Sequence, residues 1–137
     1  MSHDLNDVLL PRACAGCDYA LGMEDRTISD YQITASSYYT STSIMAPPYR
    51  ARLNDAGVLG LEYPYWQDPN PPDNWIQVDL LVVHTVASLA LQGAPGASHY
   101  VQTFKLAHSL DLDTWTYYST AGGSSVSLNT IFMYFVR

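Results

Sequence analysis

The chain has 137 residues, of which 47% are apolar and 14% are charged, which fits one globular domain and argues against disorder or a coiled coil. Six Lys and Arg against 13 Asp and Glu give a net charge of −7, and Lys105 is the only lysine, so the composition excludes a cationic nucleic-acid surface. The same balance makes phospholipid a less favoured partner, although apolar loop tips insert into lipid without help from charge.

Residues 1–13 form an N-terminal extension in our interpretation of the sequence. They lack the positively charged start and apolar core of a secretory leader, and no later run reaches the length of a membrane-spanning helix. The sequence as given therefore predicts a soluble chain.

Cys14 and Cys17 form a C-x-x-C pair. In thiol oxidoreductases such a pair follows a strand and opens a helix, whereas no strand pattern precedes Cys14 and the residues after Cys17 read as loop. We expect structural cysteines of an oxidising compartment and keep a thiol oxidoreductase as the alternative. The four histidines are scattered without the spacing of a zinc site, so we expect no metal and no cofactor.

A group of acidic residues precedes the first strand pattern. It comprises Asp18, Glu24, Asp25 and Asp30. A calcium loop needs oxygen ligands at short, regular intervals, which this stretch lacks. The pattern therefore favours turn and capping roles.

Alternation of apolar and polar residues dominates the rest of the chain. In WIQVDL at 75–80, Ile76, Val78 and Leu80 fall on one face, as in a half-buried strand. Similar short runs occur at 32–37, 86–92, 101–109, 114–119 and 131–136. Stretches rich in Pro and Gly separate these runs, and no helical period intervenes. We therefore predict an all-β fold, an antiparallel sandwich or barrel.

The segment 40–74 lacks a clear period and exceeds normal connection lengths, which predicts a functional loop. Aromatic residues lie in it or beside it: Tyr38, Tyr39, Tyr49, Tyr63, Tyr65 and Trp66. Such rings stack on sugars, accept an arginine cation or fill a pocket on a protein; the alternative is packing over the end of the sandwich. We expect no enzyme, because the nucleophile-elbow, dinucleotide and phosphate-loop patterns are absent.

Several distinctive segments follow one another along the chain. They are CDYALGMEDRTISDYQITASSYY from Cys17, RARLN at 50–54, WIQVDL at 75–80, LALQG at 89–93 and YVQTFKLAHSLDLDTWTYY at 100–118. With these segments in this order, the chain resembles the coagulation factor V/VIII type C, or discoidin-like, domain family, and YALGMEDRT is similar to discoidin domain receptors. The resemblance implies an eight-stranded jelly-roll sandwich over 14–137, non-enzymatic and extracellular or at the cell surface. Its loops at one end would bind glycans, phospholipid head groups, collagen or other proteins.

The resemblance places the ligand surface on three loop clusters, around 37–50, 55–74 and 94–100. The predicted ligand contacts are Tyr38, Tyr39, Trp66, Asp68 and Asp73. By position, Tyr39 corresponds to the residue that lines a pocket for a carboxy-terminal arginine in neuropilin-like members. We predict a recognition or cell-adhesion module for a collagen-like protein, a basic peptide or a glycan, with a secreted lectin as the alternative.

The chain also departs from the family pattern. Ala94 follows Gly93 where many collagen-binding and lectin-like relatives have arginine, and the family's G-x-W before the central strand is absent. The family usually closes with a strand whose Cys pairs with the first Cys, whereas this sequence stops at IFMYFVR and leaves Cys14 as the only other thiol for Cys17. We expect a C-terminally shortened domain, which is either truncated or has an altered ending. A missing last strand would expose a sheet edge, through which the chain would form a homodimer or lose solubility.

Overall fold

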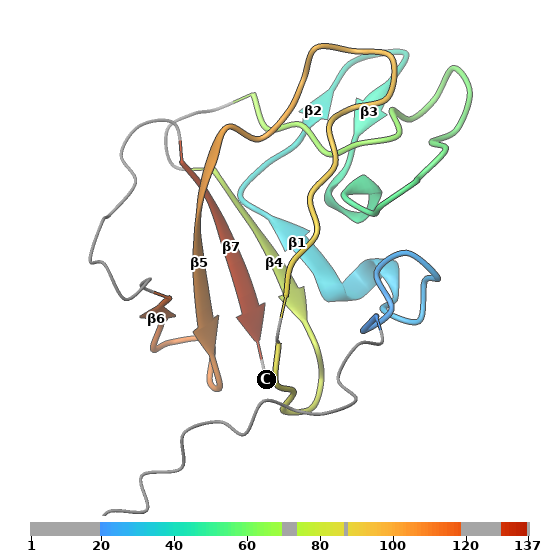
Figure 1. The fold of residues 1–137 in the computed structure, drawn as a ribbon. Helices are drawn as coiled ribbons and strands as arrows, with labels where there is room; N and C mark the ends of the chain where they lie inside the picture. Colours follow the sequence, from blue (N-terminus) through green and yellow to red (C-terminus); the bar gives the residue numbers. More distant parts are fainter. Residues whose placement is uncertain (1–19, 70–73, 87, 119–129, 137) are drawn as a thin grey trace, which may run out of the picture.

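The structure is a computed structural model, and it describes residues 20–69, 74–86, 88–118 and 130–136. Its main element is a five-stranded sheet (Figure 1). In spatial order, the strands are β1 (Ile33–Ala35), β4 (Trp75–Asp79), β7 (Thr130–Val136), β5 (Thr103–Ser109) and β6 (Thr116–Tyr117). Within the described residues the helical elements are short 3-10 turns, so the all-β prediction is confirmed.

The direction of β7 differs from the prediction. β1 runs antiparallel to β4, with Ile33 opposite Val78, and β6 runs antiparallel to β5. β7 runs parallel to both of its neighbours, with Val136 beside Asp79 of β4 and Ser109 of β5. The expectation of a purely antiparallel arrangement is therefore wrong for this strand. Long stretches of chain separate β7 from β4 and β5, as the crossover of a parallel pair requires.

A smaller two-stranded sheet lies beyond the start of the main sheet, at the upper end of the view in Figure 1. It pairs β2 (Tyr39–Thr40) with β3 (Met45–Ala46) as an antiparallel hairpin. Two 3-10 turns flank these strands: η1 (Asp30–Gln32) leads into β1, and η2 (Pro48–Arg50) follows β3. The rest of the described part of segment 40–74 is irregular, as predicted.

The core forms where β1 and β4 turn the same face inward. Ile33 of β1 packs with Ile76 and Val78 of β4, and Ile28 and Leu80 complete the buried cluster. Burial alternates along β4, which confirms the face predicted from WIQVDL. The core lies close to the loops, because half-buried side chains from the 49–66 region pack against the same cluster.

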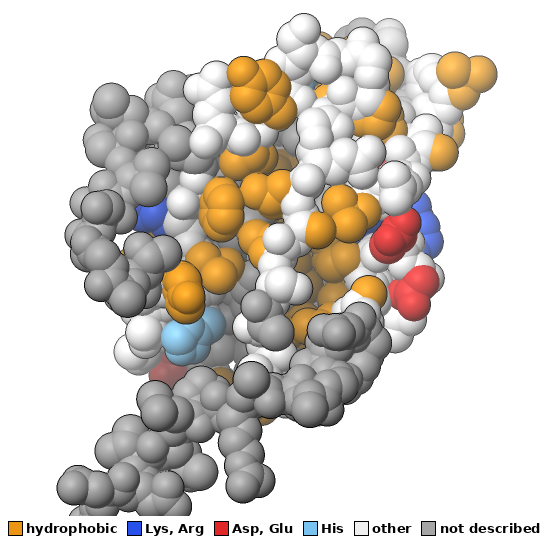
Figure 2. All heavy atoms as spheres, viewed as in Figure 1, with side chains coloured by type: hydrophobic (Ala, Val, Ile, Leu, Met, Phe, Trp, Pro, Cys, Tyr) orange, Lys and Arg blue, Asp and Glu red, His pale blue; other side chains and the backbone are white. Residues whose placement is uncertain are grey.

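The segment 86–92 was predicted as a strand, and this prediction is wrong: its described residues form no strand. Val86, Leu89 and Leu91 line, together with Ile76 and Val78, a cavity of ≈ 720 Å³, so the segment passes over the face of β4. Both edges of β4 are already paired, one with β1 and one with β7, so no free edge is available there. Figure 2 shows the hydrophobic side chains gathered over the middle of this face.

The edges of the main sheet are short. β1 and β6 form them with three and two residues, whereas β7 lies in the middle between β4 and β5. Short edge strands are one way in which proteins limit edge-to-edge association. Homodimerisation through an edge therefore stays a prediction. In the described part of the chain, no helix has the length and apolar character needed to cross a membrane.

Candidate ligand-binding site

Four rings from three loop clusters make an aromatic ladder, consisting of Tyr39, Tyr63, Tyr65 and His99. The ring centroids of Tyr39 and Tyr63 are 6.3 Å apart, and those of Tyr63 and Tyr65 are 5.1 Å apart in a stacked arrangement. His99 meets Tyr65 edge to face at 5.7 Å. These separations are within the range of favourable aromatic pairs. The ladder thus joins segments 37–50, 55–74 and 94–100.

Backbone hydrogen bonds fix these loops to the small sheet. The amide of Met45 in β3 donates to the carbonyl of Leu61 at 2.9 Å, and the amide of Tyr63 donates back to the carbonyl of Met45 at 2.8 Å. On the other side, the amide of Tyr39 in β2 donates to the carbonyl of Gln67 at 2.7 Å. Residues 61–67 therefore enclose the β2–β3 hairpin, and this arrangement sets the spacing of Tyr39, Tyr63 and Tyr65.

The predicted contact residues lie at different depths. Tyr38 is 43% exposed, whereas Tyr39 is half-buried in the ladder. Trp66 packs against the core and donates its indole N–H to the carbonyl of Ser37 at 3.0 Å. Asp68 is half-buried beside it. The remaining predicted residues lie outside the described part of the chain: Asp73, Cys14 and Cys17.

A groove of ≈ 360 Å³ lies beside the ladder. Tyr65 and His99 of the ladder form part of its wall, together with the exposed ring of Tyr100. Asp68 and Gln102 contribute polar groups. His99 was considered in the sequence only as a metal ligand, because nothing local places it next to Tyr65.

The 58–61 tip is an exposed apolar turn that the sequence analysis missed. Its residues are Val58, Leu59, Gly60 and Leu61, of which Leu59 is fully exposed. The amide of Val58 donates to the carbonyl of Glu62 at 3.0 Å, and the amide of Leu61 donates to the carbonyl of Val58 at 2.9 Å. Because these bonds close the turn, the leucines are held outward on a defined hairpin. Apolar residues in a sequence are normally assigned to a core, which is why this turn was overlooked.

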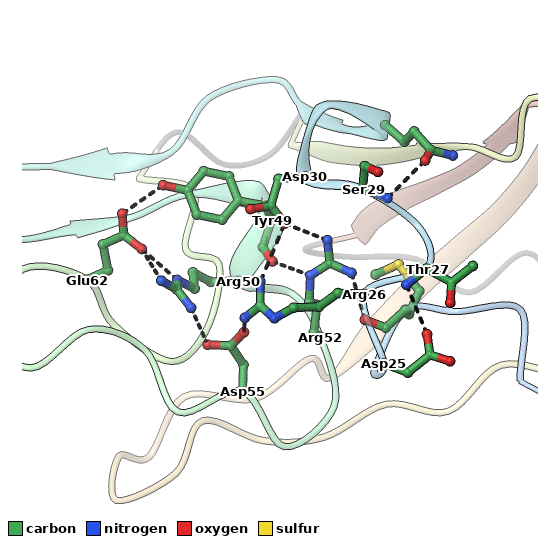
Figure 3. A network of polar contacts seen from close by, with 12 residues as sticks. Asp25, Arg26, Thr27, Ser29, Asp30, Tyr49, Arg50, Arg52, Asp55 and Glu62 are labelled. Atoms are coloured by element: carbon green, nitrogen blue, oxygen red, sulfur yellow. Dashed lines mark hydrogen bonds and ion pairs between the residues drawn. The ribbon is translucent and has the colours of Figure 1, made fainter.

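The 58–61 tip is carried by a hairpin that spans residues 55–62, and a network of ion pairs anchors this 55–62 hairpin to the body of the domain (Figure 3). Asp55, whose side chain is 1% exposed, accepts from Arg50 at 2.9 Å and from Arg26 at 2.7 Å. Arg50 also donates its Nε to Glu62 at 2.6 Å, and the Tyr49 hydroxyl donates to Glu62 at 2.7 Å. The two ends of the hairpin are thus tied to η2.

The pKa values of Glu62 and Tyr49 in this network are shifted in opposite directions. The hydrogen bond from Tyr49, joined by Arg50, holds the pKa of Glu62 below its ordinary value, although burial acts in the opposite direction. Burial and the neighbouring Glu62 raise the pKa of Tyr49 to about 12. Near neutral pH, Glu62 is therefore ionised and Tyr49 protonated, which is the pairing that the hydrogen bond needs.

The acids before β1 serve the structure of that turn. An Asp25 carboxylate oxygen accepts the amide of Thr27 at 3.0 Å, and this bond lowers the pKa of Asp25. Asp30 accepts the buried Arg52 guanidinium at 2.6 Å. The predicted turn role is confirmed for Asp25. Asp30 instead forms an ion pair with a distant arginine, and Glu24 accepts the side-chain amide of Asn54 at 2.6 Å. Asp18 lies outside the described ranges. Across those ranges, no group of three or more His, Cys, Asp or Glu side chains is arranged to hold a metal ion.

Comparison with known families and proteins agrees with the all-β fold. The family model of the F5/8 type C domain matches residues 32–134, most of the chain. The chain belongs to the F5/8 type C, or discoidin, domain family. Lactadherin of Rattus norvegicus is 37% identical over 116 residues, which cover 81% of this chain and 26% of that protein. Two human proteins are also similar. The EGF-like repeat and discoidin I-like domain-containing protein 3 is 37% identical, and the match covers 80% of this chain and 23% of that protein. Coagulation factor VIII is 36% identical, and the match covers 77% of this chain and 4% of that protein.

The family assignment confirms the resemblance and the β-sandwich class. This chain spans about a quarter of the length of the lactadherin that it matches. The discoidin domains of such relatives are extracellular ligand-binding modules.

Proposed function

We propose that this chain is an extracellular recognition module that binds a protein ligand through the loops at one end of the sandwich, without enzymatic activity. The observation that supports it most strongly is the aromatic ladder, because it gathers rings from three loop clusters at one place. Aromatic side chains on loops held by a rigid scaffold are frequent anchors of protein interfaces. Membership of the discoidin family supports the same function.

The ligand that we propose is basic, such as a protein ending in arginine or a collagen-like chain. A net charge of −7 attracts basic proteins over a distance. The rings of Tyr38 and Tyr39 offer faces to an arginine cation once the ligand has arrived. Trp66 and Asp73 stay predicted as further ligand contacts.

A synthetic peptide that ends in arginine tests the proposal, with the same peptide ending in glutamate as its control. By isothermal titration calorimetry, Tyr39→Ala should weaken arginine-peptide binding by about twofold to thirtyfold, since a cation–π contact is worth ~0.5–2 kcal/mol. The temperature of unfolding should change little. Tyr31→Ala is the matched control, because Tyr31 is an exposed tyrosine on η1, outside the loop clusters.

Other outcomes of this experiment are equally informative. If Tyr39→Ala lowers binding and thermal stability together, Tyr39 is a packing residue and not a ligand contact. If neither the arginine peptide nor triple-helical collagen binds while a glycan array gives a signal, the protein-ligand proposal is wrong and the lectin alternative replaces it.

Insertion of the 58–61 tip into a membrane is a second candidate function, favoured by the full exposure of Leu59 on a closed hairpin. Burial of one leucine is worth ~1.5–3 kcal/mol, so Leu59→Ser should reduce binding to phosphatidylcholine/phosphatidylserine vesicles about tenfold or more. Leu110→Ser is the control, because Leu110 is also exposed but follows β5 at the opposite end of the sheet. Vesicle sedimentation measures how much of each variant binds to the lipid. If Leu59→Ser and Leu110→Ser bind vesicles equally well, the 58–61 tip is not a membrane anchor.

A further inference from the structure

Asp68 is held by two serine hydroxyls that follow β1. Ser36 Oγ donates to Asp68 Oδ2 at 2.5 Å, and Ser37 Oγ donates to Asp68 Oδ1 at 2.5 Å. Hydrogen bonds from hydroxyls to an ionised carboxylate have this length and are about twice as strong as bonds between neutral groups. We name Ser36, Ser37 and Asp68 the serine–aspartate clamp.

The clamp continues into the main sheet. The amide of Trp75, the first residue of β4, donates to Ser36 Oγ at 2.9 Å, and the amide of Ser36 donates to the carbonyl of Trp75 at 3.0 Å. The Ser36 hydroxyl thus accepts from the sheet and donates to Asp68. Such a chain strengthens each of its bonds, because donation and acceptance at one hydroxyl polarise each other.

The clamp also borders the aromatic ladder on both sides. Ser37 lies two residues before Tyr39, and Asp68 lies three residues after Tyr65. Between these points, the amide of Tyr39 donates to the carbonyl of Gln67, and the amide of Gln67 donates to the carbonyl of Ala46 at 3.3 Å. A change in the distance between Ser37 and Asp68 therefore changes the separation of the two loops that carry Tyr39 and Tyr65.

We infer that Asp68 is a positioning residue, which fixes the aromatic ladder through Ser36 and Ser37 instead of contacting the ligand. Each of its carboxylate oxygens lies against a hydroxyl of the chain itself, and the residue is half-buried between the two loops that it connects. The inference rests on the proposed function in one respect: it takes the aromatic ladder as the surface where the ligand binds. The negative charge is then used to hold the loops at a fixed spacing.

Amide hydrogen exchange measured by NMR tests the clamp without any ligand. Asp68→Asn retains one carbonyl acceptor and replaces the other oxygen with a donor, so exchange at the amides of Tyr39 and Gln67 should accelerate about tenfold. The amide of Ile28, which donates to the carbonyl of Gly22, should be unaffected. Asp113→Asn is the matched control, since it makes the same charge change at an exposed turn.

A double-mutant cycle then separates positioning from contact. The Ser36→Ala/Ser37→Ala variant should reproduce the faster exchange, and Asp68→Asn added to it should change exchange less than twofold. With the arginine-ended peptide as the probe, Asp68→Asn should weaken binding only when the serines are present. Should Asp68→Asn fail to fold, Ser37→Ala alone provides the milder test of the same amides.

Two results would overturn the inference. One is unchanged exchange at Tyr39 and Gln67 in Asp68→Asn; the other is an equal loss of peptide affinity on adding Asp68→Asn with and without the serines, which would make Asp68 a ligand contact. If the peptide does not bind to the unmodified protein, the proposed ligand is wrong, and the exchange rates still decide whether the clamp positions the ladder.

Discussion

Replacement of Asp55 by alanine should be among the most destabilising single changes outside the apolar core. Its carboxylate is almost completely buried and accepts from Arg50, which is 11% exposed, from Arg26, which is 48% exposed, and from the amide of Gly57 at 2.7 Å. Breaking a buried ion pair by removing one partner costs ~3–5 kcal/mol. Water can solvate the half-exposed Arg26, and Arg50 keeps Glu62 as a partner, so we expect about 3 kcal/mol, the lower end of that range.

For a chain of this length, that loss corresponds to a fall in Tm of roughly 10 °C. Urea unfolding followed by tryptophan fluorescence measures the free energy, and a thermal scan by circular dichroism measures the Tm. Asp55→Asn, which retains one acceptor, should lose about half as much, whereas Asp113→Ala at an exposed position should stay within ~0.5 kcal/mol of the unmodified protein. If Asp55→Ala were no more harmful than Asp113→Ala, the buried network would not hold the hairpin.

Two further predictions concern the same hairpin. Gly57 and Gly60 both have positive φ, but a Cβ at Gly57 would lie 2.5 Å from the Glu62 carbonyl oxygen, whereas a Cβ at Gly60 meets nothing within 4 Å. Gly60→Ala should therefore cost ~1 kcal/mol in urea unfolding and Gly57→Ala clearly more; equal costs would contradict the predicted contact. Because Tyr49 and Arg50 lower the folded-state pKa of Glu62, its stabilising effect is present above its ordinary value of 4.5 and is lost as the pH falls through the lowered pKa. Glu62→Gln should flatten the pH–stability curve, measured by thermal unfolding, in the acidic range below this value. If the curve of Glu62→Gln is the same as that of the unmodified protein, the Glu62 carboxylate does not contribute to the pH dependence of stability.

The elements that were predicted correctly depend on local patterns. The alternation in WIQVDL is a property of neighbouring residues, and it placed Ile76 and Val78 on the buried face of β4. The same pattern at 86–92 gave a wrong strand because a strand also needs a free edge beside it, and β4 has none. The parallel direction of β7 is likewise set by how distant segments cross over, and period two does not encode it.

The candidate site was predictable in composition but not in geometry. Tyr38 and Tyr39 were identified because they lie beside the long irregular segment 40–74, where aromatic rings on loops can bind a ligand. The contact of Tyr65 with His99 joins residues far apart in the chain, so the sequence offered no signal for it. The acids were visible too, yet their partners were not: Asp68 is paired with serines and Asp55 with arginines, and both pairings depend on the fold.

These internal pairings predict how salt affects ligand binding. Asp55 and Glu62 are paired with Arg50, and Asp68 is held by serines, so none of these carboxylates is placed to contact the ligand. A basic ligand is instead attracted at long range by the net charge of −7 of the whole chain. Raising the salt from about 0.1 M to about 1 M shortens the screening length from ~10 Å to ~3 Å. Stopped-flow fluorescence should then show the association rate constant of the arginine-ended peptide falling several-fold, with the dissociation rate nearly unchanged, as expected of charges that steer encounter. If salt instead accelerated dissociation, a loop carboxylate would be paired directly with the ligand, and the assignment of these acids to internal partners would be wrong.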